Sequence, residues 1–586
     1  MVKETRNPIL KSIYKYLGKL TDGLSVIKFD IYPNVKYGSE KHIQICERMI
    51  TKLKPIISKD VDEAHPKQPY VSESVIQKIR TRMDKTYHAG RPFKSSDIGM
   101  VAMKELDELC KVVESSENIA KYKDTAVVKR ESIIGFPAYT KNMEEKWAWI
   151  RLAAIFVSQG FKRCKLVKFR AVFTVYFRRQ WKSISNKNIQ TDEGLKEIDR
   201  KLEDNWIMAR NRQVFGGDPV NVVVSLALQS CQHVVYDTFK EIINISTSNE
   251  WFNMNEGHVI CLDIKQFDSC FNASMFDRIM ECVEKIVDLP GWTDYMKDRV
   301  AIYKDENGKI HVTSDTSNPS GQAAVTITNF LMGLSLNTYI LRRIWPDFNL
   351  LNYKEHVKRI INKGDDTLIA FNSEEDLQKY ENELAKMAEE GLTLFAKETP
   401  PAMLGFLAYQ PSKGKYYMDY NYTNMAAGLC QKEKQDTEYF YISWMAKQEI
   451  LNRHAIGKKI LKAFEETFYE IMGISYSDHV LLHMSQTEKD VLEGKDISQL
   501  KVQDLLVMIK PEMALYKFKL SEINRAVLDI YYLSLSGEEV YDLIHGDRSD
   551  YNKDIDDESI KMINEIPDIE EIVNNYNNSN NMRSDI

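Results

Sequence analysis

The sequence lacks the features that mark several classes of protein. Its eight cysteines are scattered, with no CxxC pair and no paired histidine spacing of the kind found at zinc sites. No stretch approaches the roughly 20 apolar residues that a membrane-spanning helix needs, and the first residues, MVKETRNPILK, lack the apolar core of a secretory signal. A phosphate-binding loop of the form GxxxxGKS/T is also absent. We therefore expect a soluble, intracellular protein without a disulfide framework or a membrane segment.

The composition is that of a large globular protein, but its basic residues are unevenly distributed. Of 586 residues, 43% are hydrophobic and 28% are charged, and the formal net charge of −6 does not by itself indicate a polyanionic partner. Residues 161–190, however, contain nine Lys or Arg and no Asp or Glu. These residues alternate with Val, Phe, Tyr and Trp, a pattern that suits a groove lined for phosphates. The alternative is a solvated strand or helix face.

Two distant segments place carboxylates beside apolar runs. In HVICLDIKQFDSCF, an apolar run typical of a buried strand leads to Asp263, and Asp268 follows five residues later. In RIINKGDDTLIAF, two apolar runs flank Gly364, Asp365 and Asp366, which predicts a hairpin with carboxylates at its turn. Taken separately, the first pair could be a helix cap and a surface residue, and the second pair ordinary turn formers.

If these carboxylates lie close together in the fold, they would form a binding site for divalent metal ions. Three carboxylates that converge at strand ends form a hard-oxygen site suited to Mg²⁺ or Mn²⁺. Two such ions, about 3.5 to 4 Å apart, lower the pKa of an attacking hydroxyl and offset the charge on a departing oxyanion in phosphoryl transfer. The pattern therefore favours nucleotidyl transfer.

The segment between them, SDTSNPSGQAAVTITNFLMGLSLNTYI, runs from a Pro-Ser-Gly loop into an apolar helix. Gly321 would let the backbone approach a ligand closely, and the amides at a helix N-terminus favour phosphate. Asn329 stands nine residues after Ser320 and could reach Asp268 to read a ribose hydroxyl. The alternative is an ordinary loop followed by a core helix with a satisfied Asn.

The order and spacing of these motifs match a known family. Asp263-x4-Asp268, the SGQ loop with Asn329 in the following helix, and then Gly-Asp-Asp resemble palm motifs A, B and C of viral RNA-dependent RNA polymerases. The resemblance implies that Asp263 and Asp365 are the main ligands of Mg²⁺ or Mn²⁺, with Asp366 in the same site.

The same resemblance implies roles in nucleotide binding. Asp268 and Asn329 would select ribonucleotides, and the loop from Ser320 to Gln322 would be flexible and touch the template and the incoming nucleotide. The family usually has Thr five residues after the Ser. This chain has Val325 there, so the role of that hydroxyl is not carried over.

A basic segment upstream extends the resemblance. Lys168 and Arg170, in KFRAVF, match the K-x-R-x-V core of motif F, whose cations contact the triphosphate of the incoming nucleotide. The planar guanidinium makes Arg170 the better bidentate partner, with Lys168 acting as a point charge. Lys165, Arg178 and Arg179 are alternatives.

Two downstream segments extend it further. The resemblance places the motif D lysine at Lys397, where it would protonate the departing pyrophosphate. The alternative is a solvent-facing lysine beside Glu398. Residues 404–411, LGFLAYQP, look like the motif E hairpin between palm and thumb.

The implied architecture is an α+β right-hand polymerase with an antiparallel palm sheet and a helical thumb. The expected parts are an N-terminal extension that bridges fingers and thumb (1–110), fingers (111–257), palm (258–289), a fingers insertion (290–312), palm (313–411), thumb (412–544) and an acidic C-terminal tail (545–586). The tail would be either a solvated, mobile end or a segment that folds back into the basic template or product channel as an RNA mimic.

The implied reaction is template-directed transfer of a ribonucleoside monophosphate from an NTP to an RNA 3′-hydroxyl, for replication and transcription of a viral genome. Partners would be RNA template and product, NTPs and a viral capsid protein, in the virion or the host cytoplasm. One alternative is a reverse transcriptase, which normally has a bulky aromatic residue where Asp268 stands. Another is a non-enzymatic viral RNA-binding protein. The motif F segment and the size resemble picobirnavirus or partitivirus polymerases, and a picorna-like virus is the alternative.

Overall fold

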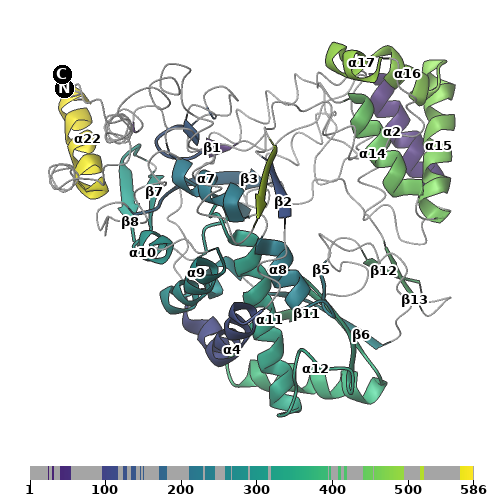
Figure 1. The fold of residues 1–586 in the computed structure, drawn as a ribbon. Helices are drawn as coiled ribbons and strands as arrows, with labels where there is room; N and C mark the ends of the chain where they lie inside the picture. The colour runs from purple at the N-terminus through teal and green to yellow at the C-terminus, as the bar shows by residue number, and fades with distance from the viewer. Residues whose placement is uncertain are drawn as a thin grey trace.

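The computed structural model describes the segments that carry most of the predicted motifs (Figure 1). Lys168 lies outside them. The described residues are 24, 30–31, 40–53, 96–116, 123–127, 134–139, 146, 149–150, 153, 170–180, 210–228, 231–244, 258–264, 267–287, 291–305, 307–314, 318–392, 395–397, 407–410, 415–418, 440–452, 455–493, 515–519 and 568–584.

Five strands form the sheet on which the predicted carboxylates lie, and they pair in the order β11-β6-β10-β9-β5. The strands are β5 (Ile243–Asn244), β6 (His258–Ile264), β9 (Val357–Lys363), β10 (Asp366–Phe371) and β11 (Phe395–Lys397). The pairs among β11, β6, β10 and β9 are antiparallel, whereas β5 lies parallel to β9, which the sequence pattern did not predict. Consecutive residues of β10 are buried, so both faces of the sheet are covered, which explains its continuous apolar run.

The hairpin predicted for RIINKGDDTLIAF is confirmed. β9 and β10 pair antiparallel, with Lys363 opposite Asp366, so only Gly364 and Asp365 form the turn. Gly364 has φ +66°, a left-handed conformation that glycine adopts without steric cost and that tight hairpin turns require. The backbone at this turn also touches a helix, since a Cβ added to Gly333 would lie 2.6 Å from the Gly364 carbonyl oxygen.

The helices beside this sheet share one hydrophobic core with it. They are α4 (Met103–Glu114), α9 (Ala273–Val287), α11 (Val325–Ile344) and α12 (Glu374–Glu389). Nearly every residue of α11 from Ile327 to Leu341 is buried, as expected for a helix that is apolar on all sides. Helix α12 begins after Ser373, whose side chain accepts a hydrogen bond from the Asp376 amide and so caps the helix.

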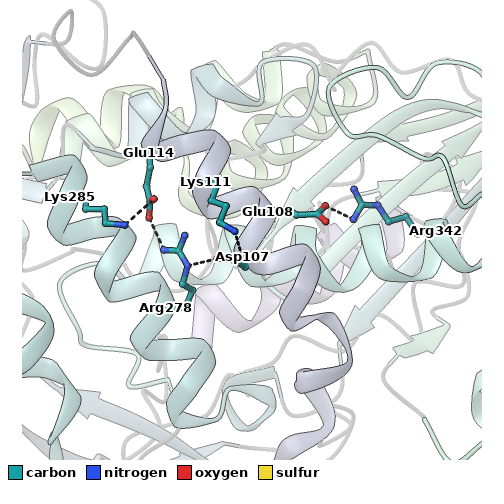
Figure 2. A network of polar contacts seen from close by, with 7 residues as sticks. All are labelled: Asp107, Glu108, Lys111, Glu114, Arg278, Lys285 and Arg342. Atoms are coloured by element: carbon teal, nitrogen blue, oxygen red, sulfur yellow. Dashed lines mark hydrogen bonds and ion pairs between the residues drawn. The ribbon is translucent and has the colours of Figure 1, made fainter.

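Ion pairs hold α4 against its two neighbouring helices (Figure 2). The Arg278 guanidinium of α9 donates to Asp107 at 2.8 Å and to Glu114 at 2.6 Å, and Arg342 of α11 donates to Glu108 at 2.6 Å. Lys285 also reaches Glu114, at 3.1 Å. Burial raises the pKa of Glu114, but the hydrogen bonds from Arg278 and Lys285 outweigh that effect and leave the pKa below its usual value. Helix α4 therefore remains attached to the core by charge as well as by packing.

A second sheet contributes buried residues to the same hydrophobic core and contains the end of the basic segment. Its strands pair in the order β1-β3-β7-β8, and β4 pairs with β3. They are β1 (Asp30–Ile31), β3 (Val172–Gln180), β4 (Arg210–Gly216), β7 (Val300–Lys304) and β8 (Ile310–Thr313). The C-terminal helix α22 (Ile569–Ser584) packs beside β8 (Figure 1).

A separate helical cluster brings together residues from both ends of the chain. It consists of α2 (Glu40–Leu53), α14 (Phe440–Asn452), α15 (Ala455–Met472), α16 (Tyr476–Leu482) and α17 (Gln486–Leu492). Ile45 and Met49 of α2 pack in one core with Trp444 and Phe464, and Figure 1 shows the purple α2 among the green helices. The N-terminal segment thus completes a core that is formed mostly by C-terminal residues.

The interval 412–544, which we expected to be helical, also contributes strands. β13 (Lys415–Met418) pairs antiparallel with β12 (Leu407–Gln410), so residues of the predicted motif E segment do form a hairpin. β14 (Leu515–Lys519) pairs with β2 (Lys123–Val127). The last four residues of β14, YKFK, alternate between aromatic and basic side chains, which favours a strand over a helix.

Candidate active site

The predicted carboxylates come together at one end of the first sheet. Asp263 lies directly opposite Asp366 on the neighbouring antiparallel strand, and the Ile264 amide donates to the Asp365 carbonyl oxygen at 3.0 Å. Directly opposed residues project from the same face with Cβ atoms about 4.5 to 5.5 Å apart. Sheet pairing therefore places Asp263 and Asp366 within reach of one ion, with Asp365 on the adjoining turn.

Two like charges in directly opposed positions destabilise a strand pair. A divalent cation bound between them would remove this repulsion, and carboxylate oxygens are the donors that Mg²⁺ and Mn²⁺ prefer. The donor set therefore fits such an ion. In the part of the chain that the structure describes, however, no group of three or more His, Cys, Asp or Glu side chains is already arranged as a coordination cage.

Asn329 lies close to the carboxylate turn. A Cβ added to Gly364 would lie 3.8 Å from the Asn329 Nδ2 atom, and the Asn329 Oδ1 atom accepts a hydrogen bond of 2.6 Å from Asn318. The Asn318 amide in turn donates to the Asp268 carbonyl oxygen at 3.0 Å. Asn318 therefore joins the two residues predicted to read the ribose. Asn318 was not among the residues predicted from the sequence, and no local pattern marks it.

The SGQ loop has different contacts from those expected. Gly321 approaches protein backbone rather than an open ligand site, because a Cβ added there would lie 2.1 Å from the Phe215 carbonyl oxygen. The Ser320 Oγ atom accepts a hydrogen bond from the Phe215 amide at 3.1 Å. These contacts fasten the loop to the end of β4.

Gln322 and the start of α11 also turn inward. The Gln322 side chain is buried and accepts a 2.6 Å hydrogen bond from the Ala324 amide, while the Ala323 amide donates to Asn221 at 3.3 Å. The Ala323 and Ala324 amides, which stand just before the first residue of α11, therefore have protein partners in the loop and in α7 (Pro219–Leu228). The phosphate site expected at this helix N-terminus stays a prediction.

Arg170 is paired with the C-terminal tail. Its Nη2 atom donates to Asp568 at 2.8 Å and also pairs with Glu570. Burial lowers the pKa of Arg170, but the two carboxylates outweigh that effect and raise it. Residues 568–584 are therefore not the solvated, mobile end that was one of the two expectations, because α22 is docked on the second sheet through buried Ile569, Ile572 and Val573.

A buried carboxylate joins the start of β3 to α7. Asp218 accepts hydrogen bonds from the Val172 amide at 2.9 Å, from the Tyr295 hydroxyl at 2.7 Å and from the Asn221 amide at 2.8 Å. Burial raises the pKa of Asp218, although these hydrogen bonds oppose the shift. The signal in the sequence was Asp followed by Pro, which marks a helix start but does not reveal these distant partners.

The remaining predicted residues are only partly described. Lys397 ends β11, whose Ala396 pairs with Asp263, so the backbone of Lys397 lies one residue from a carboxylate position. The contacts of its side chain, and the whole of Lys168, lie outside the described residues.

Among the described helices, none has both the length and the apolar character required to cross a membrane.

Comparisons with known proteins agree with this geometry. The family described as viral RNA-dependent RNA polymerase matches residues 181–471, about half of the chain, which include every predicted site residue except Lys168 and Arg170. No curated protein sequence matches the chain significantly.

Solved structures extend the likeness to the fold. The RNA-dependent RNA polymerase of bacteriophage phi12 shares 12% sequence identity, covers 84% of this chain and 89% of its own, and gives a TM-score of 0.54. The BmCPV RNA-dependent RNA polymerase at its elongation state shares 12% identity over 66% of this chain and 35% of its own, with a TM-score of 0.36. The family match and the fold lead to one conclusion: this chain belongs to the viral RNA-dependent RNA polymerases.

Proposed function

We propose that this RNA polymerase transfers ribonucleoside monophosphates from NTPs to an RNA 3′-hydroxyl at the end of the first sheet. The observation that carries the proposal is the pairing of Asp263 opposite Asp366, with Asp365 on the turn between β9 and β10. Three carboxylates from two distant segments would thereby share one site. The reaction would serve replication and transcription of a viral RNA genome.

Asp263, Asp365 and Asp366 would hold Mg²⁺ or Mn²⁺, because opposed carboxylates offer hard oxygen donors and repel each other without a cation. Bound divalent ions supply a more acidic attacking hydroxyl and offset the charge on the leaving pyrophosphate. The chain itself contributes the fixed spacing of the donors, since backbone hydrogen bonds between β6 and β10 set their positions.

Nucleotide selection would take place beside these carboxylates. Asp268 and Asn329 would contact the ribose, because Asn329 borders the carboxylate turn and Asn318 connects it to Asp268. Ser320 and Gly321 would contact the template or the base through the exposed parts of the loop. Gln322 would support the loop without touching the nucleotide, because its buried side chain is hydrogen-bonded to protein groups.

The triphosphate would be bound by Arg170 together with Lys168. Arg170 holds two carboxylates in this structure, and a guanidinium that binds carboxylates in this way can bind phosphate oxygens equally well. The nucleotide would have to displace Asp568 and Glu570, so the tail acts as a competitor for the phosphate-binding cation. Lys397 would protonate the leaving pyrophosphate.

The packing supports an assignment of the parts of the right hand. The first sheet with α9 and α11 would be the palm, and the second sheet would belong to the fingers, because it unites strands from 172–216 with strands from 300–313. The helical cluster would be the thumb, with α2 as the N-terminal segment that reaches it. RNA and NTPs would be the ligands. A capsid protein as partner and a location in the virion or host cytoplasm remain predictions.

The decisive experiment is incorporation of labelled nucleotide on a defined RNA template. We expect synthesis with NTPs that requires Mg²⁺ or Mn²⁺ and that dNTPs do not support. The Asp365→Asn variant should fold and bind RNA but should lose synthesis, while Asp347→Asn, an exposed residue after α11, should behave like the wild type. Full synthesis by Asp365→Asn would disprove the proposal, and a preference for dNTPs would instead identify a reverse transcriptase.

A further inference from the structure

A buried chain of amide hydrogen bonds lies behind the predicted ribose-binding residues. We call Asn318, Gln322, Thr328 and Asn329 the Asn318 network. Asn318 donates from Nδ2 to Asn329 Oδ1 at 2.6 Å, and Gln322 donates from Nε2 to Asn318 Oδ1 at 3.3 Å and to Thr328 Oγ1 at 2.8 Å. Asn318 and Thr328 are fully buried, and Gln322 is nearly so.

The donor and acceptor roles in the Asn318 network are fixed by the backbone of Ala324. The Ala324 amide can only donate, and it donates to Gln322 Oε1 at 2.6 Å. The Ala324 carbonyl can only accept, and it accepts from the Thr328 hydroxyl at 2.9 Å, so that hydroxyl must accept from Gln322. Both contacts require Gln322 to present Nε2 toward Asn318.

The orientation of the Asn329 side-chain amide follows from the same donor and acceptor roles. Because Gln322 donates to Asn318 Oδ1, the other end of the Asn318 amide is the donor, and it meets Asn329 Oδ1. Asn329 must then present its NH₂ group away from Asn318, toward the turn that bears Asp365. An asparagine amide can normally rotate by half a turn and exchange donor for acceptor, but here that rotation would bring two donors together.

Asn318 is also held in place by its own backbone. Its amide donates to the Asp268 carbonyl oxygen at 3.0 Å, and the following residue is Pro319, which restricts Asn318 to an extended conformation. One buried residue thus sets both the spacing between Asp268 and Asn329 and the orientation of the Asn329 amide.

We propose that Asn318 is a positioning residue for ribose selection, which fixes Asn329 as a hydrogen-bond donor toward the 2′-hydroxyl of the incoming nucleotide. The inference rests on the proposed function. The hydroxyl would donate a hydrogen bond to the Asp268 carboxylate and accept one from Asn329, so its donor and one of its acceptor lone pairs would be used. A deoxynucleotide offers no such oxygen and leaves both groups without this partner, which is the basis of discrimination.

The test reverses the direction of the network without removing it. In Asn318→Asp, the introduced carboxylate cannot donate, so Asn329 rotates, donates to the carboxylate and presents Oδ1 to the ribose. We expect kcat/KM for NTP, relative to dNTP, to fall roughly tenfold, the usual value of one hydrogen bond of about 1.4 kcal/mol. Any general effect of the added charge acts on both substrates and cancels in the ratio.

A second variant helps to distinguish an effect on nucleotide selection from a folding defect. Asn318→Ala removes the donor without adding charge, leaves Asn329 free to rotate, and should lower the same ratio by roughly threefold. The matched control is Asn372→Asp, because Asn372 also donates through Nδ2, to the carbonyls of Lys354 and Glu355, but is exposed and remote from the network. The control should retain the wild-type ratio, and thermal unfolding should show folded protein in every case.

The failure of this inference differs from the failure of the proposed function. Equal losses with NTP and dNTP in both Asn318 variants, or an unchanged ratio, would show that Asn318 only supports the fold. A wild-type protein that polymerises both substrates equally would also overturn the inference while leaving the polymerase proposal intact. A wild-type protein that incorporates neither would defeat the proposed function itself.

Discussion

The two charged regions of the candidate active site are held by different forces. Asp263 and Asp366 are positioned by backbone hydrogen bonds between paired strands, which do not depend on the identity of their side chains. Arg170 is positioned by ion pairs with Asp568 and Glu570, whose side chains are 50% and 44% exposed. The spacing of the two carboxylates is fixed by the sheet. In the Arg170 ion pairs, by contrast, another anion can replace the carboxylates, and the strength of the pairs depends on salt.

The difference suits the chemistry that we propose for each region. Metal ligands must keep the same spacing through every catalytic cycle. A pair of strands within the shared hydrophobic core keeps that spacing constant. A phosphate-binding cation must release its ligand each time, and an exposed ion pair worth about 0 to 1 kcal/mol permits this. Burial of Ile569, Ile572 and Val573, at roughly 1.5 to 3 kcal/mol each, keeps α22 docked more firmly than its charges do.

The largest expected effect comes from the region fixed by the sheet. Asp263→Asn should lower nucleotide incorporation by about a thousandfold or more, because a missing metal ligand removes several kcal/mol of charge stabilisation. Mg²⁺ should raise the melting temperature of the wild type but not of this variant, as thermal unfolding would show. Equal stabilisation of both proteins by Mg²⁺ would contradict the assignment of Asp263 as a ligand.

The next effect tests the contact between the SGQ loop and β4 of the second sheet. Gly321→Ala places a Cβ where only 2.1 Å separates it from the Phe215 carbonyl oxygen, so the loop must move away from β4. We expect a loss of roughly 1 to 3 kcal/mol in the free energy of unfolding. Incorporation should fall by about a hundredfold, because a small displacement near the reacting groups is costly. Full activity would show that this close approach is dispensable.

A smaller effect should come from the region held by ion pairs. The double variant Asp568→Asn, Glu570→Gln leaves the buried face of α22 intact and frees Arg170. We expect the KM for NTP to fall about fivefold at low salt, which corresponds to an exposed ion pair of about 1 kcal/mol. The difference from the wild type should shrink as salt is added. An increase in KM would instead show that the carboxylates help to position Arg170.

The smallest effect concerns pH. Burial raises the pKa of Asp568, but the hydrogen bonds from Arg170 and from the Ile569 amide, together with the charge of Arg170, outweigh that effect and lower the pKa below its usual value of 3.8. The stabilising contribution is therefore complete above the unfolded pKa and is lost as the pH falls through the lower folded value. Because the group is half exposed, we expect less than about 1 kcal/mol. Urea titrations of the wild type and Asp568→Asn should differ at pH 6 and converge as the pH falls below 3.8.

The carboxylate hairpin was predictable because its signals are local. Apolar runs on both sides of Gly364 specify two strands, and the glycine specifies the tight turn. The order of the motifs then indicated that Asp263 belongs to the same site. The helical character of residues 440–492 was equally readable from its periodicity.

Other contacts could not be read in this way. The roles of Gly321 and Gln322 were predicted from glycine's freedom and from the family, whereas the structure packs both against protein. The choice between a mobile tail and a docked one depended on residues hundreds of positions apart. Asn318 carried no pattern that distinguishes it from any other polar residue in a loop, and the Asp-Pro pair at Asp218 marked a helix start without indicating its distant partners.

The amino-acid sequence by itself determined the elements that carry the chemistry, because strand, turn and helix preferences act over a few neighbouring residues. Only the tertiary structure decided which groups meet: Asp263 with Asp366, Arg170 with Asp568, and Asn318 with Asn329. Such meetings depend on how separate elements bury their apolar faces together. That burial is a property of the whole fold, and no short segment contains it.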